Sequence, residues 1–233
     1  MNEVITLGSL AIAVQRKNIK NMYLKVHPPD GDVLISAPSH LQLETIRMFA
    51  ITKLPWIKQQ RQQIQSQERE PAHDYVNRES HYLWGDRYLL KIVEANKPPQ
   101  ISRSHQTLLL QVRPKTSPDQ KEAIIAQWYR EQLKQAIPPL IEKWELIMGV
   151  TVNRFFVQKM KTKWGSCNIT AKNIRLNLEL AKKPKKCLEY VVVHEMTHLL
   201  EPTHNKNFVA LMDSFLPDWK NHQELLNTLP INS

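Results

Sequence analysis

The sequence is poor in cysteine and glycine, and it contains no long apolar run. Its two cysteines, Cys167 and Cys187, are too few for a disulfide framework, so we expect a reducing compartment and a cytoplasmic location. No stretch of about 18 apolar residues suggests a membrane span. The apolar segment 7–14 lacks a preceding basic segment and a small-x-small cleavage site, so it predicts a first β-strand instead of a signal peptide. The five glycines form no phosphate-binding run.

Acidic residues are also scarce relative to basic ones. Lysine and arginine number 32 against 22 aspartate and glutamate, a formal charge of +10. Such an excess attracts polyanions without specificity. It has two interpretations: nonspecific contact with nucleic acid or nucleotides, or a generic basic surface without such a partner. No helix-turn-helix, zinc-finger or RNA-recognition signature indicates specific binding. The basic run 182–186 could meet phosphates, but we favour a solvated approach to a helix.

The pattern of apolar residues predicts an α+β protein with two parts, residues 1–115 and 116–233. The first part is expected to be strand-rich with a helical insertion. Its expected elements are a hairpin 23–35 turning at Gly31, a helical region 41–67 divided by Pro55, a linker 66–74, a hairpin around Gly85-Asp86 and a strand 107–112.

The second part should contain mostly helices. Ser117, Pro118 and Gln120 form a capping-box start, and Pro138-Pro139 should break that helix before a second one ends at Gly149. Trp128-Tyr129-Arg130 on this helix is interpreted as part of a core stripe. The remaining expected elements are strands 154–160 and 174–180, a helix from Pro184 to about Leu200, a final helix 205–215, and a surface His222 after it.

The segment 191–200, V-V-V-H-E-M-T-H-L-L, carries an H-E-x-x-H motif at His194, Glu195 and His198. Its apolar flanks indicate a buried helix, on which residues four positions apart share a face. The two histidines can therefore hold one metal ion at about 2.0–2.1 Å, and Glu195 can reach a water molecule on it. Buried imidazoles cost free energy unless they are satisfied, and a zinc ion satisfies both.

His204 is the expected third ligand, because a catalytic zinc usually takes three protein ligands and one water molecule. Pro202 ends the helix, so the chain can turn back and bring His204 to the ion. The spacing from His198 to His204 equals that of the metzincin motif, but Glu201 occupies the glycine position of that motif. The turn must therefore be of another kind.

These residues predict a hydrolase that uses one zinc ion per chain. Zinc would acidify its bound water and offset charge on the substrate oxygen, while Glu195 takes the proton of the attacking water and passes it to the leaving group. Two other interpretations are a histidine pair satisfied within the core and a closed structural zinc site. A structural site would favour cysteine ligands, and neither Cys167 nor Cys187 adjoins the motif.

Several segments, in their order along the chain, resemble the YgjP-like metallopeptidase family, which is related to the SprT-like and WLM zinc peptidases. They are K-W-G-S-C at 163–167, I-R-L-N-L at 174–178, the H-E-x-x-H segment and H-N-K-N-F at 204–208, with P-D-G at 29–31, A-P at 37–38 and W-I at 56–57. The resemblance covers nearly the whole chain. It implies a zincin-like domain in the last hundred residues, zinc ligands at His194, His198 and His204, and Glu195 as the catalytic residue.

The expected function is a zinc-dependent metallopeptidase acting on a protein or peptide. Two alternatives stay open: a metal-dependent UTP pyrophosphatase, an activity that the resemblance also suggests, and an enzyme brought to DNA-bound protein by its basic charge. The W-G-S-C segment also has two interpretations. Ser166 or Cys167 could sit in a turn near the substrate, or Trp164 could pack under the helix while Gly165 permits a turn, which we favour.

Overall fold

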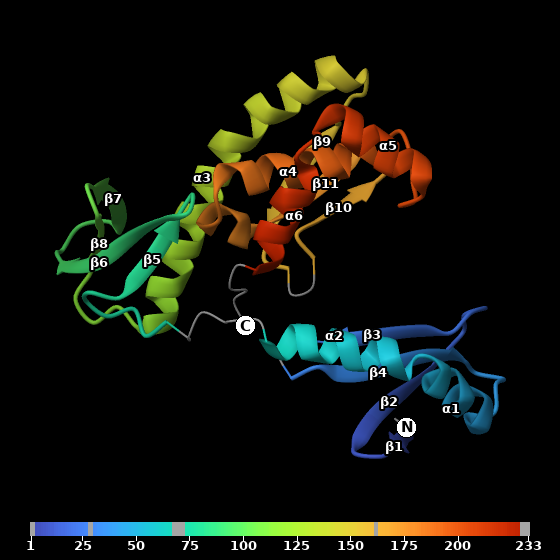
Figure 1. Cartoon of the computed structure of the whole chain (residues 1–233). Helices are drawn as coiled ribbons and strands as arrows, with labels where there is room; N and C mark the ends of the chain where they lie inside the picture. Colours follow the sequence, from blue (N-terminus) through green and yellow to red (C-terminus); the bar gives the residue numbers. More distant parts are fainter. Residues whose placement is uncertain (1–2, 28–29, 67–72, 161–162, 229–233) are drawn as a thin grey trace. The chain divides into compact units, whose positions relative to one another are not determined.

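The computed structural model describes residues 3–27, 30–66, 73–160 and 163–228. The chain divides into two compact units, Met1–Glu70 and Pro71–Asn232 (Figure 1). Each unit has its own cluster of buried apolar side chains. The expected linker 66–74 lies largely outside the described residues.

The first unit contains a four-stranded sheet in the order β1-β2-β4-β3. Its strands are β1 (Glu3–Leu7), β2 (Leu10–Lys17), β3 (Tyr23–His27) and β4 (Asp32–Pro38). The hairpin expected at 23–35 is confirmed, because β3 and β4 pair antiparallel with His27 opposite Asp32. Every second residue of β2 is buried from Leu10 to Val14, the pattern of a sheet with one face against a core.

Two helices, α1 (Leu43–Thr52) and α2 (Leu54–Ser66), complete this unit. Pro55 lies in the first turn of α2, where a missing backbone N–H costs little, so the expected division of the helical region at this proline is confirmed. Ile46 and Ala50 of α1 and Ile57 of α2 are fully buried in the same cluster as the strand residues. The core of this unit therefore lies between the sheet and the two helices.

The second unit opens with another four-stranded sheet, in the order β5-β6-β8-β7. Its strands are β5 (Ser80–Leu83), β6 (Asp86–Glu94), β7 (Gln100–Ser104) and β8 (Thr107–Val112). The hairpin around Gly85-Asp86 is confirmed: Trp84 and Gly85, both at positive φ, join β5 to β6. The backbone N–H of Trp84 donates to the carbonyl of Ala181 at 2.8 Å, which ties this hairpin to the segment before the H-E-x-x-H helix.

One continuous helix, α3 (Pro118–Met148), runs where two helices were expected. The capping box of Ser117 and Gln120 and the left-handed Gly149 after the last turn are confirmed. The break expected at Pro138-Pro139 is wrong. The prolines remove the helical bonds to the carbonyls of Lys134 and Gln135, whose side chains are exposed, so water can replace those bonds. The helix is held meanwhile by a fully buried stripe that includes Leu133 and Ile137.

The last part of the second unit packs helices against a three-stranded sheet of order β10-β11-β9 (Figure 1). Its elements are β9 (Arg154–Gln158), β10 (Gly165–Asn168), β11 (Asn173–Asn177), a 3₁₀ helix η1 (Leu178–Lys182), α4 (Lys185–Thr197), α5 (Lys206–Phe215) and α6 (Trp219–Thr228). The strand expected to reach residue 180 ends at Asn177, because the Asn177 side chain accepts the N–H of Glu179 and starts η1. Helix α6 was not predicted, and it contains His222, which is not the surface residue expected: its side chain is only 14% exposed.

The boundary between the two compact units differs from the boundary expected after residue 115. The sheet β5–β8 contributes Leu90, Leu108 and Leu110 to the same buried cluster as α3 and α4, so it belongs with the H-E-x-x-H helix. The polar segment 66–74, interpreted from the sequence as a linker, spans the boundary between Glu70 and Pro71. No helix among the described residues is both long and apolar enough to cross a membrane.

Candidate metal centre

Helix α4 carries the H-E-x-x-H motif and is buried along most of its length. Val191, Val192 and Val193 are almost fully buried, which fixes the rotation of the helix beneath the motif. His194 lies on its last turn and His198 forms its C-terminal cap, so the two imidazoles emerge from the same face. The buried hydroxyl of Thr197 donates to the carbonyl of Val193 at 2.8 Å, so this polar group has its hydrogen-bond partner within the helix.

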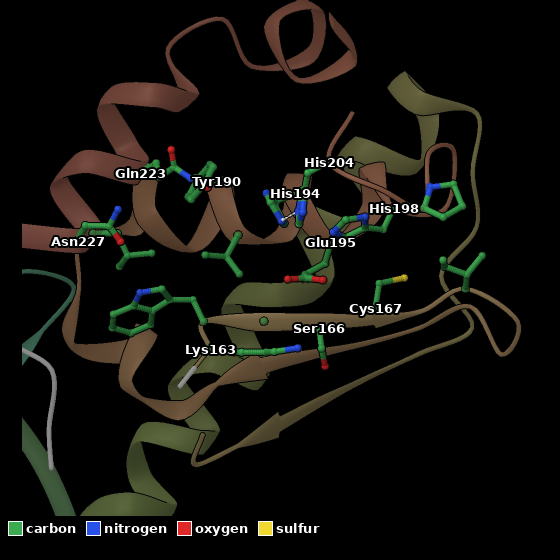
Figure 2. A pocket seen from close by; sticks show the side chains of 16 residues that line it. Lys163, Ser166, Cys167, Tyr190, His194, Glu195, His198, His204, Gln223 and Asn227 are labelled. Atoms are coloured by element: carbon green, nitrogen blue, oxygen red, sulfur yellow. Dashed lines mark hydrogen bonds between the residues drawn. The ribbon is translucent and has the colours of Figure 1, made fainter. Parts of the chain in front are cut away.

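The chain turns back after His198 as expected. The N–H groups of Leu200 and Glu201 donate to the carbonyl of Thr197, which closes the last turn of the helix before Pro202. Asn205 then caps α5 by accepting the N–H groups of Asn207 and Phe208. This reversal brings Nε2 of His204 to 3.0 Å from Nε2 of His194 (Figure 2).

The three histidines form a compact cluster. Their ring centroids lie 5.0 Å (His194 to His198), 4.9 Å (His194 to His204) and 4.7 Å (His198 to His204) apart. One nitrogen of each ring lies within 4.8 Å of the corresponding nitrogen of the other two. Nitrogen ligands at about 2.0–2.1 Å from a tetrahedral ion are about 3.4 Å apart, so the cluster fits one ion with small adjustments.

Two further features suit these rings to a metal. The Nδ1 atom of His198 lies 3.2 Å from the carbonyl oxygen of Glu201, which favours the tautomer that leaves Nε2 free as a ligand. Burial, together with the neighbouring histidines, lowers the pKa of His194 to about 4, and burial also lowers the pKa of His198. Both rings are therefore neutral near pH 7, the form that binds metal ions.

Phe208 supports the cluster from α5. Its ring centroid is 5.0, 4.8 and 4.7 Å from those of His194, His198 and His204, and the residue is 2% exposed. No role for Phe208 was predicted from the sequence. Its position four residues after His204, at the start of a predicted helix, was the available signal, because such a residue can pack beneath the ligand that precedes the helix.

Glu195 lies across from the edge strand β10 (Figure 2). Burial raises the pKa of its carboxyl to about 8, and the nearby charge of Lys163 acts in the opposite direction. A Cβ atom at Gly165 would lie 2.5 Å from Oε1 of Glu195, so glycine at this position makes room for the carboxylate. The structure thus brings Glu195 into the same cleft as the three histidines.

The cleft has a volume of about 520 Å³. It is lined by α4, by β10 and by α6, and Figure 2 shows Gln223 and Asn227 of α6 at one end. The side chain of Asn177 donates to the carbonyls of Met160 and Lys163 at 2.8 Å, which fixes the chain as it enters β10. Lys163 lines the cleft, a position that was not predicted from the sequence.

The W-G-S-C segment differs from both expectations in its backbone. Gly165, Ser166 and Cys167 form a strand, not a turn. The φ of Gly165 is not positive, so glycine is not needed here for a left-handed backbone; it is needed for the space beside Glu195. Ser166 and Cys167 nevertheless line the cleft with Trp164. Burial raises the pKa of the Cys167 thiol to about 11, so it is not an activated nucleophile.

Other residues singled out in the sequence lie apart from the cleft. Tyr129 is buried in the core, as expected for the stripe on α3, and its hydroxyl donates to the carbonyl of Tyr82. The solvated interpretation of the basic run is wrong for Lys182 and Lys183, which are buried; Lys182 pairs with Glu179 at 2.9 Å. Lys185 and Lys186 are exposed.

An α+β fold in which two histidines of an H-E-x-x-H helix gather with a third from the turn after it defines a zincin-like metallopeptidase, a class that requires a divalent metal ion. The chain belongs to the YgjP-like family: the family described as "YgjP-like, metallopeptidase domain" matches residues 20–229. The resemblance found in the sequence is thereby confirmed.

Two solved structures of metallopeptidase zymogens are similar to part of the chain. They are abylysin from Pyrococcus abyssi, with a TM-score of 0.36, and jannalysin from Methanocaldococcus jannaschii, with a TM-score of 0.33. Each is 18% identical and covers 40% of this chain, with 97% and 92% of its own length matched. No curated protein matches the chain significantly.

Proposed function

We propose that the protein is a zinc-dependent peptidase that cleaves peptide bonds, with His194, His198 and His204 as zinc ligands and Glu195 as general base. The observation that carries the proposal is the convergence of three imidazoles in a cleft that also holds a buried carboxyl group. A bound zinc ion would supply Lewis acidity toward a water molecule and the scissile carbonyl.

The protein side chains supply proton transfer and orientation. Glu195 takes a proton from the attacking water through a carboxylate oxygen and then delivers it to the leaving amine. Gly165 leaves space for that carboxylate, and Phe208 keeps the three rings in place. The positive charge of Lys163 favours the ionised form of Glu195, which is the form that acts as a base.

The edge strand favours a peptide substrate. β10 lies at the end of the order β10-β11-β9 and its residues line the cleft. An extended peptide can pair with such an edge through main-chain hydrogen bonds, which brings a peptide bond past the histidines without a requirement for particular side chains.

The UTP pyrophosphatase alternative finds less support in the cleft. Among the lining residues within the described part of the chain, Lys163 is the one lysine or arginine, whereas a nucleoside triphosphate presents several negative charges. The overall charge of +10 is the observation in its favour. Phosphate release from UTP that is lost in a His194→Ala variant would support it.

The test compares zinc-loaded wild type with Glu195→Gln on an unfolded protein and a peptide library. We expect cleavage by wild type, a loss of at least about 100-fold in Glu195→Gln, and unchanged zinc content in that variant. Glu224→Gln, an exposed carboxylate on α6, is the matched control and should keep full activity. No cleavage by wild type, or equal cleavage by wild type and Glu195→Gln, would overturn the proposal.

A further inference from the structure

A second group of potential metal ligands lies in the same unit but outside the cleft. It consists of His73 and Glu79, which precede β5, and His81 within β5. Their donor atoms lie within 4.8 Å of one another. We propose that these three residues bind a second divalent transition-metal ion of the zinc type. This inference does not depend on the proposed peptidase activity.

The distances suit such an ion. Nδ1 of His73 is 2.8 Å from Oε1 of Glu79, and Nε2 of His81 is 3.6 Å from Oε2 of the same carboxylate. Ligand atoms at about 2.0–2.2 Å from a tetrahedral zinc ion are about 3.3–3.6 Å apart, so the three groups are already near that spacing. Two histidines and one carboxylate are also a donor set that zinc uses in proteins.

Burial makes His81 the most informative member of the group. The residue is 2% exposed, and its Nε2 atom is buried without a hydrogen-bond partner among the described residues. Its backbone is fixed by the pairing of β5 with β6, where it lies opposite Tyr88. A buried nitrogen without a partner costs free energy, and coordination to an ion removes that cost.

Hydrogen bonding within the loop accounts for part of the cluster. The carboxylate of Glu79 also accepts the backbone N–H groups of Asp74 at 3.0 Å and Val76 at 3.2 Å. Each carboxylate oxygen has two lone pairs, so these bonds leave room for an ion. They do not satisfy Nε2 of His81.

The rings of His73 and His81 are stacked, with centroids 4.5 Å apart and planes at 15°. In-plane lone pairs of parallel rings do not meet at one point, so metal binding requires one ring to turn. His81 is held in the sheet, whereas His73 lies on the segment before it, so the ring of His73 is the one that turns. We therefore expect the ion to fasten this segment to β5.

The adjoining cavity indicates a structural role and not a second active site. Its volume is about 50 Å³, enough for one or two water molecules but not for a substrate. Lys182 and Lys159 line it, but each is paired with a glutamate, at 2.9 Å to Glu179 and 3.1 Å to Glu122. The local positive charge is thus largely balanced.

Metal content per chain tests the inference. Purified full-length protein is loaded with zinc, desalted and measured by mass spectrometry of the metal. We expect two zinc ions in wild type, one in His194→Ala/His198→Ala, and none when Glu79→Gln is added to that double variant. His105→Ala, an exposed histidine of the same unit, is the control and should leave one ion in the same background.

Glu79→Gln keeps the shape of the side chain and one acceptor oxygen, which can hold the N–H group of Asp74 or of Val76 but not both, so folding should survive the loss of a single hydrogen bond. Zinc in excess should raise the thermal midpoint of the double variant by about 5–10 °C at 100 times Kd, and should not raise it once Glu79→Gln is added. A folded double variant without zinc would overturn the inference. If only the proposed catalytic site were wrong, the zinc content would differ in another way: wild type would bind one zinc ion, which would be kept in His198→Ala and lost in Glu79→Gln.

Discussion

At the scale of single residues, Gly165 and Glu195 constrain each other. Any side chain at position 165 begins with a Cβ atom, which would meet Oε1, Cγ and Cδ of Glu195 at 2.5–2.9 Å. Glu195 is 5% exposed, so it has little space into which it can retreat. A Gly165→Ala substitution should therefore displace the carboxylate without touching the histidines.

We expect Gly165→Ala to retain its zinc and to lose at least about 100-fold in kcat, because a displaced base no longer reaches the attacking water. Peptide hydrolysis and metal content measured on the same preparation check this. Wild-type activity in the alanine variant would show that Glu195 tolerates displacement, and loss of zinc would show that the strand, not the carboxylate, is what moves.

The raised pKa of Glu195 has a consequence for the metal-free protein. The folded pKa is about 8 against an ordinary value of 4.5, so the folded state binds this proton more tightly than the unfolded state. The resulting stabilisation is complete below about pH 4.5 and is lost as the pH rises through 8. Between pH 5.5 and 8 the loss is at most about 3 kcal/mol.

Glu195→Gln removes this titration. In chelator-treated protein, the difference in unfolding free energy between Glu195→Gln and wild type should therefore grow from pH 5.5 to pH 8 in favour of the variant. Urea unfolding at the two pH values measures it. The histidines are the same in both proteins, so their contribution largely cancels in the difference. A difference that does not change with pH would contradict the burial of an uncompensated carboxylate.

The sequence allowed part of the centre to be predicted at this scale. His194 and His198 could be placed on one face, with Glu195 next to the pair, because helical periodicity fixes where residues four apart project. Convergence of His204 could be argued from Pro202 alone, since a chain that leaves a helix has few directions. Phe208, Lys163 and the spatial role of Gly165 could not be predicted, because each depends on contacts between segments that are distant in sequence.

At the scale of elements, the long helix α3 shows how tertiary packing overrides a local rule. Two consecutive prolines end an isolated helix, but here Leu133, Ile137 and Ile141 continue one buried stripe across them. The two ends of α3 were predicted correctly. The cap at Ser117 and the left-handed Gly149 depend only on neighbouring residues, so the sequence was sufficient to predict them. Helix α6 was missed because three of its ten residues, Trp219, Leu225 and Leu226, are apolar, too few to mark a helix in the sequence.

Replacement of the more exposed proline should stabilise α3. In Pro139→Ala the helix regains a hydrogen bond to the carbonyl of Gln135 and loses a steric conflict, while the unfolded chain gains some freedom. We expect a net increase of about 1 kcal/mol in the unfolding free energy, measured by urea denaturation. Ile137→Ala, two residues earlier and fully buried, should instead cost about 2–5 kcal/mol. A destabilised Pro139→Ala would indicate that the backbone geometry set by this proline is required.

At the scale of the whole molecule, two separate cores explain why the boundary after residue 115 was misplaced. The predicted elements change from mainly strands to mainly helices near that residue, but the cluster of buried side chains continues across it. The sheet β5–β8 shares a core with α3 and α4, whereas the cluster around Ile12, Ile35 and Ile57 is confined to the first 70 residues. Strand-rich and helix-rich segments of one chain can thus belong to one unit when their apolar faces are complementary.

Separate cores predict separate folding. A fragment of residues 73–233 contains all residues of the larger buried cluster and the whole metal centre, so we expect it to fold cooperatively and to bind zinc like the full chain. Its thermal midpoint should lie within a few degrees of the corresponding transition in the full chain, followed by circular dichroism, and peptide hydrolysis per zinc-loaded molecule should be retained. A fragment that is folded but inactive would assign substrate binding to residues 1–72, whereas an unfolded fragment would show that the second unit depends on the first for its stability.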